Sequence, residues 1–158
     1  KDVIKLFGKT IQTDREYSFL GQERFKYKYS KIVRMAEIWK QRFLLELKKE
    51  IEEITGGDFN AVLMNHYPTG EQGMSWHSDD EREMKLQGDI CSVSFGSSRK
   101  MSFKHKKSGR IVDVQLVHGS ILIMKKQTQY HWQHCIRKTK KVIKPRYNLT
   151  FRQMLDQI

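Results

Sequence analysis

The chain has 158 residues, of which 38% are hydrophobic and 11% aromatic, so it can form one domain with a buried core and is not a disordered polypeptide. Its 30 Lys and Arg against 18 Asp and Glu give a formal net charge of +12, which disfavours a cationic partner and favours a polyanion, nucleic acid before a membrane surface. No apolar run approaches the ~18 residues of a membrane-spanning helix, and none has the character of a secretory signal.

One amphipathic helix is predicted before the middle of the chain, over residues 34–54. Gly56 and Gly57 follow it and supply a C-terminal stop. Its apolar residues recur at intervals of three or four, and they are Met35, Ile38, Trp39, Phe43, Leu47, Ile51 and Ile54.

The chain after this helix consists of short runs that are typical of β-strands. Turn residues separate many of these runs. The predicted strands cover residues 60–67, 90–95, 100–104, 111–116, 120–124, 131–136 and 146–154. One helix followed by many short strands predicts an α+β protein with a β-sandwich or jelly-roll core.

The two cysteines, Cys91 and Cys135, are far apart and form no C-x-x-C pair. A disulfide framework or a thiolate zinc site is therefore not expected, and we expect an intracellular protein.

Basic residues are concentrated in the second half of the chain. Residues 114–155 contain no Asp or Glu, and residues 99–110 carry six cations and no acid. A solvated face explains any single Lys, but a surface that serves only solubility usually mixes both signs. We therefore interpret the two tracts as a surface for a polyanion.

The stretch W-H-S-D-D-E at residues 76–81 holds the clearest pattern for a metal site. His77 and Asp79 are two residues apart, so they project to the same side of an extended backbone. His134, in a later predicted strand, is a candidate third ligand. Two imidazoles and one carboxylate leave open positions on a metal, as in the facial triad of non-haem Fe(II) oxygenases. H-x-D alone is weak evidence, because a surface turn produces the same pattern.

The predicted last strand has one polar and one apolar face. Its polar face consists of Arg146, Asn148, Thr150 and Arg152. Two guanidiniums inside a sandwich are costly unless anions meet them, and the fork of Arg matches carboxylates. This face therefore predicts a site for a small dicarboxylate. Asn65 and Tyr67 share one face of an earlier strand and are assigned to the same site.

Together these motifs resemble the AlkB family of Fe(II)- and 2-oxoglutarate-dependent dioxygenases. The spacings of 12 residues from His134 to Arg146 and of 6 from Arg146 to Arg152 match that family. The likeness runs over nearly the whole chain, and it includes the phrases N-H-Y at 65–67, W-H-S-D-D-E at 76–81, S-V-S-F-G at 92–96, H-G-S at 118–120 and P-R-Y-N-L-T-F-R at 145–152. The DNA-repair members of the homologue-two and homologue-three types share these phrases.

The resemblance implies a double-stranded β-helix, or jelly roll, that binds Fe(II), 2-oxoglutarate and O2. It implies one domain over residues 1–158, with a nucleotide-recognition region at 1–33, a supporting helix at 34–57 and the jelly-roll core at 58–158. The catalytic metal ligands would be His77, Asp79 and His134. The residues that would bind 2-oxoglutarate are Asn65, Tyr67, Arg146, Asn148 and Arg152.

The implied reaction is oxidative demethylation of N-alkylated bases in DNA, such as 1-methyladenine and 3-methylcytosine, after the base is flipped out of the stack. Residues 6–9, L-F-G-K, resemble an intercalating finger, which favours duplex DNA. The phrases around Trp76 and Trp132 are more similar to the type that prefers single strands and RNA. A silent nucleic-acid-binding module, an oxygenase for protein or small molecules and a zinc hydrolase are the other hypotheses.

The resemblance also implies two groups of residues on the substrate side. Aromatic faces would stack on the flipped base and carboxylates would accept from its amino group; this pocket comprises Tyr27, Tyr29, Ser30, Asp80 and Glu81. The predicted DNA contacts are Phe7, Gly8, Lys9, Arg99, Lys106, Lys107, Arg137, Lys138, Lys140 and Lys141. We expect a monomer that binds DNA or RNA and no membrane, and in a eukaryote a nuclear location.

Overall fold

A computed structural model describes residues 3–6, 9–12, 16–22, 26–29, 32–35, 37–80 and 88–154, with side chains described for 16–22, 37–80 and 88–154. Among these residues, no helix combines the length and the apolar character needed to cross a membrane.

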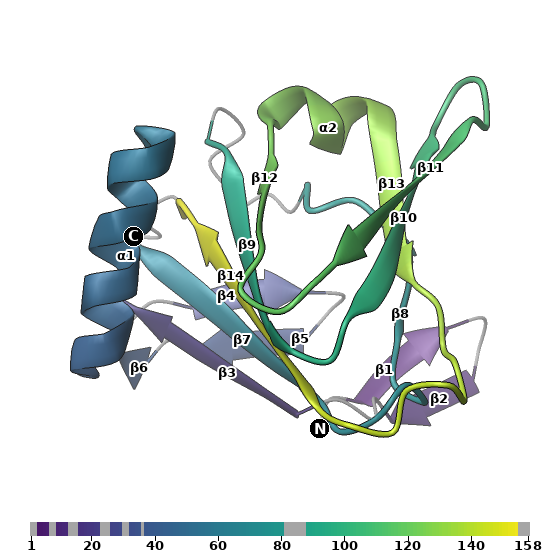
Figure 1. Ribbon diagram of the computed structural model, residues 1–158, viewed down its shortest axis with the longest axis horizontal. Helices are drawn as coiled ribbons and strands as arrows, with labels where there is room; N and C mark the ends of the chain where they lie inside the picture. Colours follow the sequence, from purple (N-terminus) through teal and green to yellow (C-terminus); the bar gives the residue numbers. More distant parts are fainter. Residues whose placement is uncertain are drawn as a thin grey trace.

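Two antiparallel sheets form the body of the molecule (Figure 1). The larger has the order β12-β9-β14-β7-β3-β6, and only the short β6 runs parallel to its neighbour. Its strands are β3 (Glu16–Gly21), β6 (Glu37–Ile38), β7 (Ala61–Tyr67), β9 (Ile90–Gly96), β12 (Ile121–Met124) and β14 (Arg146–Arg152). The smaller has the order β11-β10-β13-β8, from β8 (Met74–His77), β10 (Arg99–His105), β11 (Ile111–Leu116) and β13 (Trp132–Ile136). This pair of sheets is the predicted jelly roll.

The remaining elements lie around the two sheets. Helix α1 (Arg42–Thr55) lies along the outer side of the larger sheet, and the short helix α2 (Lys126–His131) joins β12 to β13 across the top of Figure 1. Two separate hairpins complete the described chain, one from β1 (Val3–Leu6) and β2 (Lys9–Gln12), the other from β4 (Lys26–Tyr29) and β5 (Ile32–Met35).

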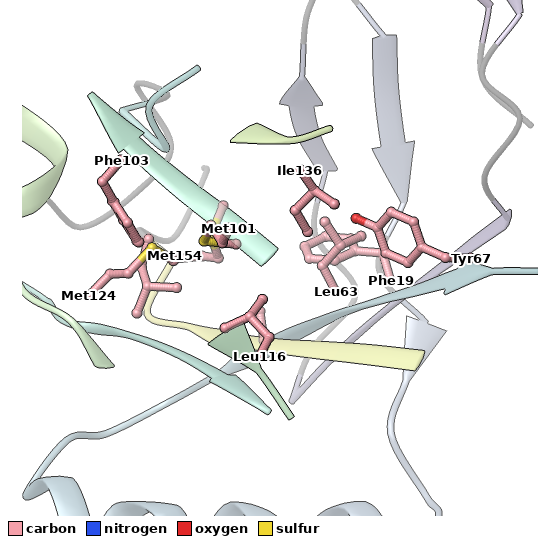
Figure 2. Close-up of a cluster of buried hydrophobic side chains, with 11 residues drawn as sticks. Phe19, Leu63, Tyr67, Met101, Phe103, Leu116, Met124, Ile136 and Met154 are labelled. Atoms are coloured by element: carbon pink, nitrogen blue, oxygen red, sulfur yellow. The ribbon is translucent and has the colours of Figure 1, made fainter. Parts of the chain in front are cut away.

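Alternation along the strands of the larger sheet produces two hydrophobic clusters, one on each side of that sheet. The inner cluster fills the space between the sheets, and Figure 2 shows Met101 and Ile136 from the smaller sheet with Leu63 and Tyr67 from the larger. The outer cluster joins Leu44 and Ile51 of α1 to the opposite face of the sheet. Because successive side chains of a strand point to opposite faces, β14 contributes Leu149 and Phe151 outward and its polar residues inward.

The predicted helix over residues 34–54 is wrong at its start. Residues 32–35 and 37–38 belong to strands, and the helix begins only at Arg42. Met35, Ile38 and Trp39 continue the helical period by coincidence, and Trp39 is buried in the outer cluster from the connection between β6 and α1. The predicted end is confirmed, because Gly56 adopts a φ of 68° and its N–H donates to Glu52 O.

All seven predicted strands are present, with bounds that differ by at most two residues. The elements that the sequence analysis did not predict include β3, β5, β6, β8 and α2. Strand β8 is short, and its pairing with β13 changes register between His134 and Ile136, so its inward residues do not alternate regularly.

Candidate metal and co-substrate site

The three predicted metal ligands converge at one end of the space between the sheets. One ligand atom from each of His77, Asp79 and His134 lies within 4.8 Å of the others. Antiparallel pairing of β8 with β13 sets His77 directly opposite His134, and their ring centroids are 4.3 Å apart. Asp79 Oδ1 is 3.6 Å from His77 Nε2, and Asp79 Oδ2 is 3.4 Å from His134 Nε2. The grouping is that of a two-histidine, one-carboxylate metal site.

The imidazole of His77 is oriented for metal binding. Its Nδ1 lies 2.7 Å from Ser75 O, and since a carbonyl only accepts, this nitrogen carries the proton. In the neutral form of this ring, Nε2 presents its lone pair toward Asp79, as a metal ligand requires. Nearby, Ser78 Oγ donates to Trp132 O at 2.8 Å and ties the ligand loop to β13.

Asp79 is an ionised carboxylate inside the protein. Burial alone disfavours its charge, but Arg152 and the two imidazoles outweigh burial and lower the pKa of Asp79 well below its usual value. Arg152 Nη2 donates to Asp79 Oδ1 at 3.2 Å. The Asp79 N–H donates to Gln129 Oε1 at 2.8 Å, so the buried Gln129 of α2 fixes the backbone of this ligand. Gln129 was not predicted, and its polar surroundings in the sequence contain no signal for it.

One cavity unites the metal ligands with most of the predicted 2-oxoglutarate residues. Its lining includes the three ligands together with Asn65, Tyr67, Asn148 and Arg152. Pairing of β14 with β7 sets Asn148 opposite Asn65 and Arg146 opposite Tyr67. Asn148 Nδ2 donates to Ser92 Oγ at 2.7 Å and its Oδ1 accepts from Thr150 Oγ1, which holds the amide rigidly.

Arg146 lies just beyond that cavity, against the ring of Tyr67. Its guanidinium carbon is 5.1 Å from the ring centroid, and its side chain is only 1% exposed. Nη2 donates to Ser94 Oγ at 3.0 Å, whereas Nε and Nη1 are buried without a hydrogen-bond partner in the described part of the chain. Burial lowers the pKa of Arg146, yet a guanidinium stays charged in proteins. A buried cation with open donors fits an anionic ligand.

Three residues of the predicted base pocket lie among the described residues. Asp80 is exposed and directly follows the ligand Asp79. Tyr27 and Tyr29 lie in β4, but their side chains are outside the described ones. Ser30, Glu81, Phe7 and Gly8 lie outside the described residues, as does the side chain of Lys9 in β2.

The prediction that Arg99 contacts DNA is wrong. Its side chain is 2% exposed, and its guanidinium donates to three backbone carbonyls, those of Thr69, Gln72 and Arg137. The other predicted cations are exposed: Lys106, Lys107, Arg137, Lys138, Lys140 and Lys141. Lys106 also donates through Nζ to Gln129 O at 2.9 Å.

The fold and the site together define a class of protein. The sequence matches the 2OG-Fe(II) oxygenase superfamily over residues 8–152, and the chain belongs to that superfamily. The cofactors of this class are Fe(II), 2-oxoglutarate and O2, and the ligand set and the open Arg146 donors fit the metal and the dicarboxylate. A solved structure described as "The structure of OsALKBH1" supports the fold, with a TM-score of 0.66 and 15% identity over 90% of this chain and 81% of that one.

Known relatives place the similarity within one branch of this class. The chain is 37% identical to "DNA oxidative demethylase ALKBH2" from Bos taurus, over 96% of this chain and 57% of the relative. It is 36% identical to the Homo sapiens protein of that name, over 96% and 61%. The "Alpha-ketoglutarate-dependent dioxygenase alkB homolog 3" of Bos taurus is 36% identical, over 90% and 52%. The resemblance to the AlkB family is thereby confirmed, and the chain spans between half and two thirds of these relatives.

Proposed function

We propose that this chain is an Fe(II)- and 2-oxoglutarate-dependent dioxygenase that removes N-linked methyl groups from bases in nucleic acid. The observation that carries the proposal is the group formed by His77 with the buried Asp79 and His134, which lies beside a cavity bordered by two buried arginines. When bound, Fe(II) supplies the O2 chemistry in which 2-oxoglutarate becomes succinate and CO2 and the methyl group is hydroxylated and lost as formaldehyde.

The residues of the chain position both partners of that chemistry. Arg152 holds Asp79 through Oδ1 and lies at the metal end of the cavity, where it would meet the carboxylate nearer the metal. Arg146, six residues earlier on the same strand face, would bind the distal carboxylate. Apolar walls that include Leu63, Met101 and Ile136 limit the access of water to the reacting atoms.

Alkylated bases such as 1-methyladenine and 3-methylcytosine suit the charge near the metal. These bases are cationic, and the exposed Asp80 adds a negative charge directly after the ligand Asp79. A base must leave the stack to reach the buried metal. Its amino group would donate to Asp80 and Glu81, while Tyr27, Tyr29 and Ser30 would line the pocket. Relatives named as DNA oxidative demethylases support this substrate.

The phosphate backbone would be bound by exposed cations on two loops. Lys106 and Lys107 lie in the turn between β10 and β11, and Arg137, Lys138, Lys140 and Lys141 precede β14. Phosphate contacts of this kind give affinity that falls with salt. The L-F-G-K segment at residues 6–9 supports a preference for duplex DNA. A nuclear location in a eukaryote and a monomeric state stay predictions.

A preference for single strands is the second candidate, and one observation favours it. Trp76, beside the ligand His77, lies under Lys104 Nζ at 4.5 Å and near the Arg137 guanidinium at 5.9 Å. Aromatic rings flanked by cations are typical of surfaces that bind unpaired nucleotides.

Formaldehyde release from oligonucleotides that contain 1-methyladenine tests both candidates. With Fe(II) and 2-oxoglutarate we expect turnover. The rates on duplex DNA, single-stranded DNA and RNA, compared at equal substrate concentrations, give the substrate preference. Asp79→Ala is expected to abolish release, while Asp58→Ala, at an exposed position remote in sequence, preserves it. Failure of the wild-type protein to demethylate any of the three substrates contradicts the proposal.

A further inference from the structure

Arg99 is a buried cation for which the proposed chemistry has no role so far. It begins β10 and points to the same side as Met101 and Phe103, into the space between the sheets. Its Nη2 donates to Gln72 O at 2.8 Å and to Arg137 O at 2.9 Å, and its Nη1 donates to Thr69 O at 3.3 Å. Three carbonyl dipoles accept hydrogen bonds from this guanidinium, but they do not neutralise its charge.

The guanidinium of Arg99 also packs against the same ring as Arg146. Its carbon lies 5.8 Å from the centroid of Tyr67, and that of Arg146 lies 5.1 Å from it. Tyr67 OH donates to Met74 Sδ at 3.2 Å and anchors the far edge of the ring. The position of Arg146 therefore depends on a ring that Arg99 helps to hold.

The carbonyls bound by Arg99 belong to a tightly packed turn. Residues 68–73 connect β7 to β8, and a Cβ at Gly70 would lie 2.2 Å from Thr139 O, while one at Gly73 would lie 2.5 Å from Ile136 O. The turn and the segments that hold these two carbonyls therefore approach so closely that no side chain fits between them, which leaves the turn little room to shift. Arg99 clamps this turn to the end of β13, and Tyr67 is the last residue of β7 before the turn.

We propose that Arg99 is a positioning residue for the distal carboxylate of 2-oxoglutarate, which it serves by holding Tyr67 and, through it, Arg146. The inference rests on the proposed binding of that carboxylate by Arg146. Two buried guanidiniums that share one ring repel each other, and a dianionic co-substrate relieves this repulsion. Arg99 therefore adds positive potential at the inner end of the cavity as well as geometry.

The test compares two 2-oxo acids that differ only at the distal end. 2-Oxopentanoate carries a methyl group where 2-oxoglutarate carries the second carboxylate. Binding of each acid is measured by calorimetry on the protein loaded with Mn(II), a redox-inactive substitute for Fe(II). We expect Arg99→Met to weaken 2-oxoglutarate about tenfold, the size of a typical coupling between neighbouring groups, and to leave 2-oxopentanoate and Mn(II) binding unchanged.

Controls separate this role from a structural one. Arg42→Met removes an exposed guanidinium that pairs with Glu46 and is expected to change neither acid. Arg99→Lys keeps the charge without the planar fork, and its affinity for 2-oxoglutarate alone is expected to fall, by about threefold. This variant replaces Arg99→Met in the test if Arg99→Met does not fold. Equal weakening of both acids, or no weakening of either, overturns the inference. Wild-type protein that fails to bind 2-oxoglutarate overturns the proposed co-substrate site itself, which is a distinguishable result.

Discussion

The two ends of the cavity between the sheets differ in how charge is balanced. At the metal end, the carboxylate of Asp79 faces Arg152 and the imidazoles of His77 and His134. At the inner end, Arg146 meets a serine hydroxyl and an aromatic ring, and the described residues offer it no carboxylate. The protein thus completes the charge balance at one end itself and leaves the other to a ligand. Removing a charge should therefore have opposite effects on stability at the two ends.

The largest effect is expected from Asp79→Asn, which removes the buried carboxylate of the metal end. Metal binding and turnover should be lost, because Asn lacks the anionic ligand atom. The free energy of unfolding of the metal-free protein should fall by about 3 kcal/mol, since Arg152, which is 4% exposed, loses the carboxylate that it faces. Urea unfolding followed by circular dichroism measures this loss. Asp58→Asn, at an exposed position, should change stability by less than ~0.5 kcal/mol.

The same variant should also alter the response to acid. The pKa of Asp79 is lowered in the folded state, so the unfolded state binds the proton more readily. Its contribution to stability is present above the ordinary value of 3.8 and is lost as pH falls below it. Between roughly pH 5 and pH 2, the stability of the metal-free wild-type protein should fall more steeply than that of Asp79→Asn. Parallel curves for the two proteins would contradict the ionised, paired state of Asp79.

The inner end should respond differently to Arg146→Met. Met fills much of the same volume without a charge, and replacing a buried unpaired cation by an apolar side chain is often neutral or stabilising. The dissociation constant of 2-oxoglutarate should rise roughly 100-fold, the loss expected for a charge-assisted contact of about 2–3 kcal/mol. Mn(II) binding should persist. A fall in stability comparable to that of Asp79→Asn would show that the inner end is also balanced by the protein.

Strand period explains why most of the site could be predicted from the sequence. In β14 the polar and apolar residues alternate, so the strand faces, and with them the inward Arg146 and Arg152, follow from the order of residues alone. By the same rule Arg99 shares the strand face of Met101 and Phe103. This shared face is the signal that would have identified Arg99 as buried. Its place in a run of cations obscured that signal, because a charge tract suggests a surface before it suggests a core.

Other features depend on contacts that no local pattern records. Met35 and Ile38 continue the helical period but lie in strands β5 and β6, and only tertiary packing, such as that of Trp39 in the outer cluster, distinguishes helix from strand here. Strand β8 was not predicted because its register breaks between its two inward residues, Met74 and His77. Gln129 is a polar residue in a polar helix, and its function arises from the meeting of α2 with a loop fifty residues earlier.

Gln129 supplies the prediction with the smallest expected effect, and it concerns the metal end alone. Its Oε1 accepts from the N–H of Asp79, so Gln129→Leu keeps the approximate volume but leaves that buried donor without its partner. Because supporting hydrogen bonds orient metal ligands, the affinity for Mn(II) should fall about tenfold.

Gln127→Leu, an exposed position on the same helix, is the matched control and should leave that affinity unchanged. The preference for 2-oxoglutarate over 2-oxopentanoate should remain as in the wild-type protein, since the inner end is untouched. If Gln129→Leu reduced that preference, the two ends could not be treated as separate parts of the site, and the contrast in charge balance would no longer predict which variants affect which ligand.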